Sequence, residues 1–518
     1  MITPLINSFR LLHTGYVLAR EGVFSFIDPS VLPPLARPAL GIVKFMARKT
    51  MSDRATRLTQ ALGKLGPSHV KFGQFMATRP DIVGLKFARD LESLQDRMPP
   101  FADNTAREII LNSLGKPVEE LFTEFGKSVA AASIAQVHKA EYKNDVFAVK
   151  VLRPNVAAQF KKDLRSFYFV ARCAERFIPA AARLKPVGIV DTLARSVTLE
   201  MDLRLEAAAL SEMRENTAND PGIRIPKPDW QRTGRDVLTM EWIEGIPLSD
   251  VDALKKSGID LPQLAKNVIQ SFLRHSIRDG FFHADMHQGN LFADTNGNLV
   301  LVDFGIMGRI GLKERRFLAE ILFGFITRNY LRVAQVHFEA GYVPAHHSVE
   351  TFAQAIRAIG EPIHSLTADQ ISMAKLFTLL FEITDMFDMQ TRTELVMLQK
   401  TMVVVEGVAR NLDPQLNMWA TAEPVVRDWI ERNLGPIGKI SEFGEGALGL
   451  LSFAPRLPML LSRGEKLLSD LEKNIAQGHS LTLSAVNVTG KTDQNSLTAL
   501  ALALWVITGL LAYMILHI

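Results

Sequence analysis

The spacing of hydrophobic and polar residues divides the chain into helical and strand-forming parts. Apolar residues recur at every third or fourth position over residues 50–125 and 155–216, as they do on one face of a helix. Between these segments the pattern becomes that of short strands, at residues 137–142 and 145–152. The sequence therefore predicts a small sheet flanked by helices.

The second half of the chain is predicted to be helical around a second group of strands. Residues 236–242 have the pattern of a strand, and helices are expected from Leu261 onward. Two short apolar runs interrupt the helices at residues 291–302. Asn296-Gly297 lies between the runs and is a strong hairpin signal, because both residue types accept the positive φ of a tight turn. Beyond residue 314 we expect helices up to a polar linker.

The C-terminal segment differs from the rest of the chain. Residues 497–518 contain no Asp, Glu, Lys or Arg. At about 1.5 Å per residue, a helix of this length crosses the ~30 Å hydrocarbon core of a bilayer. We expect a transmembrane helix here, with a buried core helix as the alternative, preceded by a Ser-, Thr- and Asn-rich linker at 479–496.

The positive charge near the N-terminus also favours contact with a membrane surface. The first 50 residues carry six Lys or Arg against two acidic residues, an excess of +4 that equals the net charge of all 518 residues. A nucleic-acid binder concentrates more positive charge, so no nucleic-acid partner is expected. Leu5, Phe9, Leu12 and Tyr16 share one helix face, which fits either an interfacial helix or a helix packed on the core. Charged residues interrupt the apolar positions, so no signal peptide is expected.

Composition bounds the class of protein. With 47% hydrophobic residues, the chain has material for two or three packed domains, which excludes a disordered or fibrous protein. Cys173 is the single cysteine and can form no internal disulfide, which fits a reducing compartment.

The most specific polar pattern lies at residues 283–305. It reads HADMHQGN, then the hairpin, then Asp303-Phe304-Gly305. Phosphoryl transfer needs a carboxylate at the acceptor hydroxyl and oxygen ligands for Mg²⁺. Asp285 is expected to serve the acceptor, and Asn290 and Asp303 to bind the metal, in the order and spacing of a protein-kinase catalytic loop.

Two upstream strands fit a nucleotide site. Alternation places Ala148 and Lys150 on one face, so that the small side chain can lie against adenine while the ammonium reaches the phosphates. The strand and hinge around Glu241 and Ile243 are expected to offer backbone groups to adenine. His283 and His287 are expected to hold the backbone of the catalytic loop rather than a metal, because no third ligand accompanies them.

An alanine-rich segment stands where a kinase has its glycine-rich loop. Alanine resists positive φ, so this loop cannot wrap its amides around phosphates as a glycine loop does. The nucleotide-binding residues expected here are Ala130, Ala131, Ala132, Ser133, Ile134, Ala135, Gln136 and Val137.

Together these motifs resemble the UbiB family of atypical, protein-kinase-like proteins linked to ubiquinone biosynthesis. Two further motifs accompany the alanine loop and the catalytic residues. They are a KxGQ motif at Lys71-Phe72-Gly73-Gln74 and an ExD motif that begins at Glu200. The resemblance runs from about residue 60 to 420 and extends to the terminal membrane helix. It implies an α+β, protein-kinase-like fold of two lobes. An N-terminal helical extension carrying KxGQ would cover the site, block protein substrates and favour ATP hydrolysis.

The resemblance also implies specific residue pairs. Lys71, with Gln74 beside it, would gate the site by pairing with Glu200 and Asp202, and Lys150 would pair with Glu206. On an ideal helix Glu200 and Asp202 lie about 200° apart, so a regular helix would not direct both toward Lys71. Either the helix is distorted there or one acid faces elsewhere.

We expect the following division of the chain: a helical KxGQ extension at 1–125, a small lobe at 126–245, a large lobe at 246–420, a helical region at 421–478, the linker at 479–496 and the transmembrane helix at 497–518.

The resemblance and the terminal helix lead us to expect a membrane-anchored, atypical kinase-like Mg²⁺-dependent ATPase that uses ATP/ADP and supports ubiquinone biosynthesis by ATP-driven handling of lipid quinone precursors. Its C-terminal helix would hold it in the inner cell membrane, with the nucleotide-binding body facing the cytoplasm. Its partners would be the lipid membrane, lipid quinone precursors and other ubiquinone biosynthesis proteins. Two alternatives remain: a small-molecule or lipid kinase acting on a quinone precursor, and a nucleotide-sensing scaffold. A peptide-directed kinase is disfavoured, because no Ala-Pro-Glu motif follows Asp303.

Overall fold

The structure is a computed structural model. It describes residues 2–26, 44–47, 53–77, 98–177, 185–365, 386–389 and 393–434, and the single positions 83, 87, 90, 91, 94 and 383. The expected linker and C-terminal transmembrane helix lie outside the described residues. Within the described part, no helix combines the length and apolar character needed to cross a bilayer.

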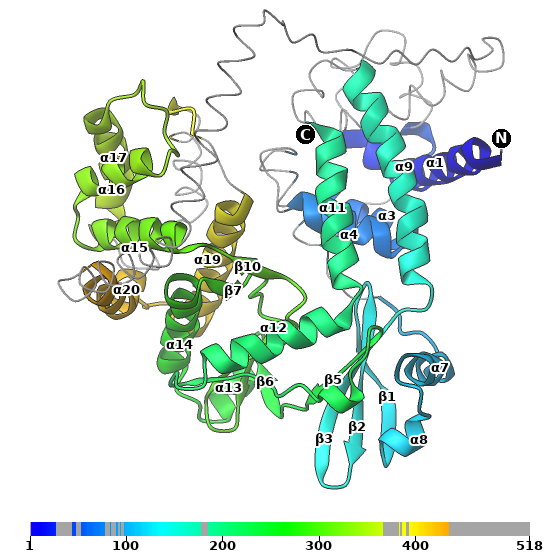
Figure 1. The fold of residues 1–518 in the computed structure, drawn as a ribbon. Helices are drawn as coiled ribbons and strands as arrows, with labels where there is room; N and C mark the ends of the chain where they lie inside the picture. The colour runs from blue at the N-terminus through cyan, green and yellow to red at the C-terminus, as the bar shows by residue number, and fades with distance from the viewer. Residues whose placement is uncertain are drawn as a thin grey trace, which may run out of the picture.

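Helices form most of the described chain (Figure 1). They are α1 (Ile2–Arg20), α3 (Arg54–Leu65), α4 (Pro67–Ala77), α7 (Asp103–Leu114), α8 (Val118–Leu121), α9 (Val156–Phe177), α11 (Pro186–Glu200), α12 (Leu203–Asn216), α13 (Val251–Lys256), α14 (Leu261–Leu273), α15 (Leu312–Ile326), α16 (Tyr330–Glu339), α17 (Val349–Ser365), α19 (Thr393–Leu412) and α20 (Met418–Leu434), with short helical turns η1 (Val23–Phe26), η3 (Trp230–Arg232) and η4 (Arg274–Asp279).

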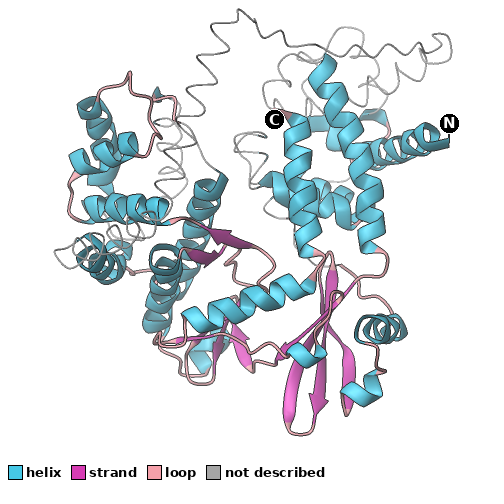
Figure 2. Cartoon of the chain, viewed as in Figure 1, coloured by secondary structure: helices cyan, strands magenta, loops and turns pink. Residues whose placement is uncertain are grey.

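The strands form two small sheets and a two-stranded ribbon (Figure 2). They are β1 (Glu124–Ala131), β2 (Ala135–Tyr142), β3 (Asp145–Leu152), β4 (Ile223–Arg224), β5 (Val237–Glu241), β6 (Gly245–Pro247), β7 (Phe281–His283), β8 (Leu291–Asp294), β9 (Leu299–Leu301) and β10 (Met307–Arg309).

The first sheet is antiparallel with the order β1-β2-β3-β5. The strands predicted at 137–142, 145–152 and 236–242 are confirmed as β2, β3 and β5. Helices α7 and α8 pack on one face through residues such as Ile110, and the other face packs on α12 through residues such as Ala207. Strand β1 was not predicted, because its residues do not alternate cleanly and its register shifts twice.

The N-terminal helices form a separate layer beyond one end of this sheet. In Figure 1, α9 and α11 rise side by side from the sheet, and α1, α3 and α4 lie against them. Their shared core includes Phe24, Leu58, Val70 and Ile189. Asp53 caps α3 by accepting the Thr56 N–H, which satisfies a donor that the helix start would leave unpaired.

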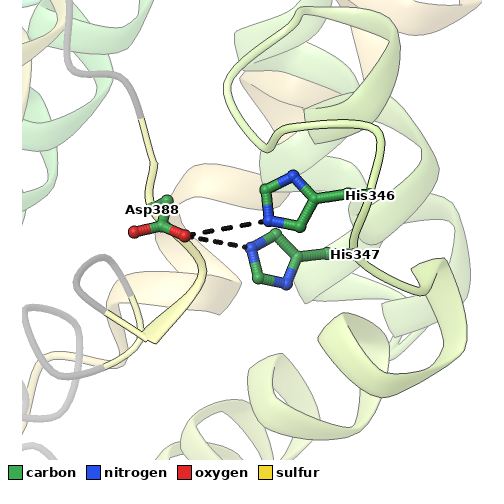
Figure 3. A group of neighbouring side chains, drawn as sticks. All are labelled: His346, His347 and Asp388. Carbon is green, nitrogen blue, oxygen red and sulfur yellow. Dashed lines mark ion pairs between the residues drawn. The ribbon is translucent and has the colours of Figure 1, made fainter.

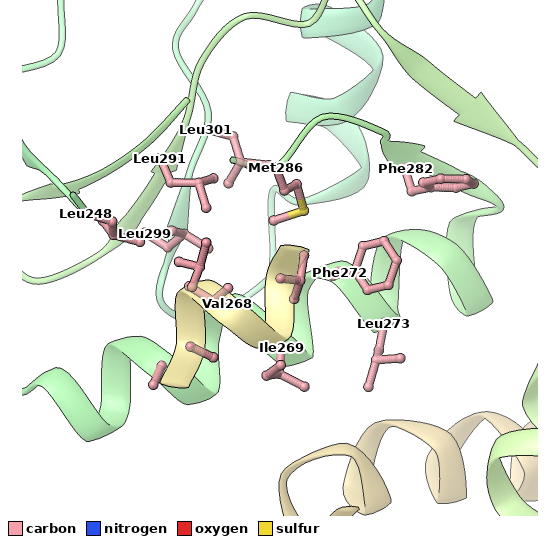
Figure 4. Close-up of a cluster of buried hydrophobic side chains, with 14 of the residues drawn as sticks. Leu248, Val268, Ile269, Phe272, Leu273, Phe282, Met286, Leu291, Leu299 and Leu301 are labelled. Carbon is pink, nitrogen blue, oxygen red and sulfur yellow. The ribbon is translucent and has the colours of Figure 1, made fainter. Parts of the chain in front are cut away.

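The second sheet and the remaining helices build the other lobe. Strands β4, β9, β8 and β6 lie in that order, and the predicted hairpin is confirmed as β8 and β9, with Gly297 at φ +79° in the turn. Figure 4 shows Phe272 of α14, Met286 of the catalytic loop and Leu301 of β9 within one buried cluster. The catalytic loop is therefore anchored in the largest core. Strands β4, β6, β7 and β10 span two or three residues each, too few to form a period in the sequence.

Candidate functional site

Lys150 on the central strand β3 joins the two lobes. Its Nζ donates to both carboxylate oxygens of Glu206, at 2.8 and 3.0 Å, and to Oδ1 of Asp303 at 3.0 Å. Burial by itself lowers the pKa of Lys150, but the two carboxylates outweigh burial and hold the pKa above its usual value. The group is therefore a charged ammonium held at the junction of β3, α12 and the segment after β9.

Asp303 follows β9 in a strained backbone conformation. Its φ is +60°, in the left-handed region that few residues other than glycine adopt. Burial opposes ionisation, but Lys150 outweighs it and holds the pKa of Asp303 below its usual range, with a smaller contribution from Lys71. The lowered pKa keeps this carboxylate ionised, and because 42% of the side chain is exposed, its oxygens are also accessible.

The loop at residues 283–290, which the sequence predicts to be catalytic, is held by the buried ring of His283. Nδ1 of this ring accepts the Asp285 N–H at 3.1 Å, and Nε2 lies 3.2 Å from the Val302 carbonyl. Burial lowers the pKa of His283, so the ring is neutral and Nε2–H donates to Val302. His287 accepts the Gly289 N–H at 3.0 Å. Both histidines thus hold the loop backbone, as expected.

Asn290 and Asp285 are coupled by the same loop. The Asn290 side-chain amide donates to the Asp285 carbonyl at 3.1 Å, and the Asn290 carbonyl accepts the Val302 N–H at 3.0 Å. The Asp285 side chain is 39% exposed, and Nε2 of His287 lies 3.6 Å from its Oδ2. The loop therefore presents the Asp285 carboxylate to solvent.

The donor atoms in this region fit Mg²⁺. Asn290 uses its amide nitrogen to hold the loop, which leaves the amide oxygen as a ligand. Asp303 contacts Lys150 through Oδ1, which leaves Oδ2 as a second. Hard divalent cations prefer such oxygen ligands.

The alanine segment forms a much shorter loop than expected. Strand β1 includes Ala130 and Ala131 and β2 begins at Ala135, so only residues 132–134 lie between the strands. The Ala132 N–H donates to the Ala135 carbonyl at 2.7 Å. Ile134 and Ala135 are buried in the core beside α12, so their side chains pack rather than face a ligand.

Residues 98–101 cross over this loop and hold it. The Met98 N–H donates to the Ala131 carbonyl at 3.1 Å, and Gln136 accepts the Phe101 N–H at 2.9 Å. Arg153 donates to the carbonyls of Ala132 and Pro99, each at 2.9 Å. Ser133 is fully buried, and its hydroxyl has no hydrogen-bond partner within the described residues. Val137 is partly buried against the large-lobe core.

The segment expected to be the adenine hinge is hydrogen-bonded to the neighbouring residues 224–227. The Glu241 N–H donates to the Lys227 carbonyl at 2.8 Å, and its carboxylate pairs with Arg224. Ile243 is half-buried just beyond β5. The side chain of Glu241 thus has structural partners of its own.

The KxGQ helix α4 contacts the acidic motif through one ion pair. Nζ of Lys71 lies 2.8 Å from Oε2 of Glu200, and both side chains are about nine-tenths buried. Asp202 instead caps α12, accepting the Arg204 N–H and pairing with the Arg204 guanidinium at 2.6 Å. Gln74 lies half-buried on α4. Glu200 and Asp202 have different partners because the motif spans a helix break: α11 ends at Glu200 and α12 begins after Asp202.

One contact to the catalytic loop gave no signal in the sequence. Thr401 on α19 is buried, and its hydroxyl lies 3.1 Å from the Ala284 carbonyl. Ala284 is the residue that replaces the usual kinase Arg. A hydroxyl so distant in sequence could not have been assigned to the site from local spacing.

Family models and curated relatives identify the family of this chain. The model of the ABC1 atypical kinase-like domain matches residues 93–337, and that of the UbiB helical domain matches residues 356–417. A "Probable protein kinase UbiB" from Marinobacter nauticus is 39% identical over 459 residues, covering 87% of this chain and 84% of that protein. A protein of the same name from Aeromonas salmonicida is 36% identical over 464 residues, with the same coverage. Among solved structures, the Rv3197–erythromycin complex from Mycobacterium tuberculosis matches 72% of this chain and 95% of that chain, at 23% identity and a TM-score of 0.48.

Proposed function

Because the chain belongs to the UbiB family of atypical kinase-like proteins, we propose that it is a Mg²⁺-dependent ATPase that supports ubiquinone biosynthesis by ATP-driven handling of lipid quinone precursors. The observation that carries the proposal is the contact of Lys150 with Glu206 and Asp303 beside the Asp285 loop. A buried cation in contact with an accessible carboxylate, near a loop that carries a second exposed carboxylate, supports the proposal, because phosphoryl transfer needs a phosphate-binding cation, a metal ligand and a carboxylate at the acceptor.

Each residue has a distinct task in this proposal. Asn290 and Asp303 would hold Mg²⁺, and Lys150 would orient the phosphates while Glu206 keeps its ammonium in place. Bound MgATP would supply the phosphoanhydride to be broken and the divalent charge that stabilises it. Asp285 would position the attacking water or a small hydroxyl acceptor. His283 would keep Asp285 in place through the backbone.

The segments next to the site, helix α4 and residues 98–101, favour hydrolysis over peptide phosphorylation. The charge of Lys71 on α4 helps to hold the pKa of Asp303 below its usual range, so the N-terminal helices influence this carboxylate. Residues 98–101 occupy the outside of the alanine loop. We infer that these segments would hinder the approach of a polypeptide substrate, whereas a water molecule needs far less space.

A cavity in the N-terminal helices supports the handling of a lipid. It measures about 130 Å³ and is lined mainly by apolar side chains of α1, α3, α4, α9 and α11, among them Phe72, Met76 and Ala171. An apolar cavity of about 150 Å³ holds a benzene-sized molecule. We assign to this cavity the ring or the first isoprene units of a quinone precursor. Because α4 lines the cavity with one face and carries Lys71, an occupant would act directly on the helix that covers the site.

Helix α1 supports contact with the membrane surface. Leu12 and Tyr16 are 47% and 48% exposed, while Leu11 and Leu18 on the opposite side are buried. Exposed apolar side chains beside basic residues are typical of an interfacial helix. Together with the transmembrane helix expected at 497–518, α1 would place the body at the inner cell membrane, facing the cytoplasm.

ATP hydrolysis by the purified full-length protein, with and without anionic lipid vesicles, tests the proposal. We expect Asp303→Asn to lower turnover by about 100-fold or more, since it removes a metal-binding carboxylate. Asp428→Asn, an exposed carboxylate paired with Arg432 on α20, is the matched control and should leave turnover unchanged. Equal hydrolysis by wild type and Asp303→Asn would refute the ATPase.

Two further experiments distinguish the ATPase from the two alternatives, a lipid kinase and a nucleotide-sensing scaffold. With γ-labelled ATP and a lipid extract, a lipid kinase would transfer label to a lipid product, whereas an ATPase releases labelled phosphate. A scaffold would keep quinone levels normal in cells that carry only Asp303→Asn, although hydrolysis is lost.

A further inference from the structure

Two consecutive histidines and a distant aspartate meet far from the catalytic loop. His346 and His347 lie in the connection between α16 and α17, and Asp388 lies in the described segment 386–389 ahead of α19 (Figure 3). Oδ2 of Asp388 is 3.8 Å from Nε2 of His346 and 3.5 Å from Nε2 of His347. One ligand atom from each residue lies within 4.8 Å of the others.

These separations suit ligands of one ion better than hydrogen bonds. Hydrogen bonds between such atoms measure about 2.7–3.2 Å. Zn–N and Zn–O bonds of about 2.0–2.1 Å place neighbouring ligand atoms of a tetrahedral ion about 3.3 Å apart. Nε2 of His347 is buried and has no hydrogen-bond partner within the described residues. A buried polar atom of this kind lacks the partner that a metal would provide.

The backbone around the cluster is already arranged to hold the three side chains together. The rings of His346 and His347 are 4.1 Å apart and lie on the same side of their loop, facing Asp388 (Figure 3). Phe387 is buried and packs on both His347 and Phe352 of α17, which places its neighbour Asp388. Asp388 has a φ of +48°, a strained conformation that is often found at ligand sites.

We propose that His346, His347 and Asp388 bind a first-row divalent metal ion, with Zn²⁺ as the expected ion. Two imidazole nitrogens and one carboxylate oxygen suit Zn²⁺, whereas Mg²⁺ prefers oxygen ligands throughout. The exposure of His346 and Asp388, 66% and 70%, leaves a fourth position to water. The ion would tie the α16–α17 connection to the chain that leads into α19, and it is distinct from the metal expected at Asn290 and Asp303.

Zinc binding by the full-length protein tests the proposal. After removal of metal by a chelator, Zn²⁺ is added and bound metal is measured by competition with a coloured chelator, with the Tm followed in parallel. We expect wild type to bind one more equivalent than His347→Gln or Asp388→Asn, and only wild type to gain Tm on adding Zn²⁺. Mg²⁺ should produce neither effect in this cluster.

Two controls keep this result separate from the ATPase proposal. Asp303→Asn should retain the extra equivalent, because it alters only the catalytic site. Asp428→Asn controls for the loss of an exposed carboxylate. If His347→Gln and Asp388→Asn, shown to be folded by circular dichroism, bind as much zinc as wild type, the three residues form only ion pairs and the proposal is wrong.

Discussion

At the scale of single residues, burial decides which titratable groups determine the pH dependence of stability. His275 in η4 is fully buried, and neither ring nitrogen has a hydrogen-bond partner within the described residues. Burial lowers its pKa to about 3. The folded protein therefore keeps His275 neutral under conditions in which the unfolded chain, with a histidine pKa near 6.5, takes up a proton.

This difference predicts a loss of stability in acid. As pH falls below 6.5, the unfolded state binds more protons than the folded state, so the free energy of unfolding falls by about 1.4 kcal/mol per pH unit for this group. We expect His275→Leu, an apolar side chain of similar size, to remove that contribution. Denaturant unfolding of both proteins at pH 7.5 and pH 5.5 measures how much the free energy of unfolding falls. The other buried histidines, His69, His283 and His337, are present in both proteins and so do not affect the difference. An identical pH dependence in wild type and variant would show that His275 does not cause it.

At the scale of elements, α1 shows how one helix can serve both the core and a surface. Leu11 and Leu18 bury one face, while Leu12 and Tyr16 expose the other. Of the four positions expected to share a face, Leu12 and Tyr16 are the ones whose side chains the structure describes, and both are exposed. Packing on the core therefore involves a different face of the helix from the one that the sequence pattern singled out.

The exposed face of α1 predicts a measurable affinity for lipid. In chains shortened to remove residues 497–518, we expect Leu12→Asp with Tyr16→Ser to weaken binding to anionic vesicles by about tenfold or more, since each buried apolar side chain contributes about 1.5–3 kcal/mol. Sedimentation with vesicles measures the binding. Leu111→Asp on α7, where Leu111 is 44% exposed, is the matched control and should bind as the shortened parent does. Unchanged binding by the double variant would argue against an interfacial role.

At the scale of the whole molecule, the buried Lys71–Glu200 pair connects α4 to the end of α11. Removing one partner takes away the nearest opposite charge from the buried group that remains, which costs up to about 3–5 kcal/mol, whereas removing both costs much less. We expect Lys71→Met and Glu200→Gln each to lower the free energy of unfolding by several kcal/mol, and the double variant to recover most of the loss. Denaturant unfolding of the four proteins measures this coupling, and additive effects would show that the pair contributes no coupling.

The cavity behind α4 leads to a prediction about function. Ala171 lines it from α9, so Ala171→Leu would fill part of the space that a precursor would use. We expect this variant to lower ubiquinone content in cells that depend on the protein, at equal protein abundance. Ala158→Leu places the same change on an exposed position of α9 and should have no effect. Normal ubiquinone levels with Ala171→Leu would show that ubiquinone synthesis does not require this cavity.

The sequence by itself determined the features that depend on neighbouring residues. Alternation identified β2, β3 and β5, and Asn296-Gly297 identified the β8–β9 hairpin. Residue order and types identified the family and predicted the catalytic loop. The roles assigned to Asp285 and Asn290 remain predictions.

The family resemblance implied that Lys150 pairs with Glu206 and Lys71 with Glu200, but only the tertiary structure decided the geometry of these pairs and which further residues they meet. Lys150, Glu206 and Asp303 come from three elements, and their distances depend on how the lobes pack. The expected pairing of Lys71 with Asp202 is wrong, because a helix break after Glu200 turns Asp202 toward the start of α12, a choice that the helical period left open. The covering of the alanine loop by residues 98–101 and the meeting of the two histidines with Asp388 leave no periodic trace in the sequence. Local spacing encodes which face of an element is apolar, whereas packing alone decides what that face contacts.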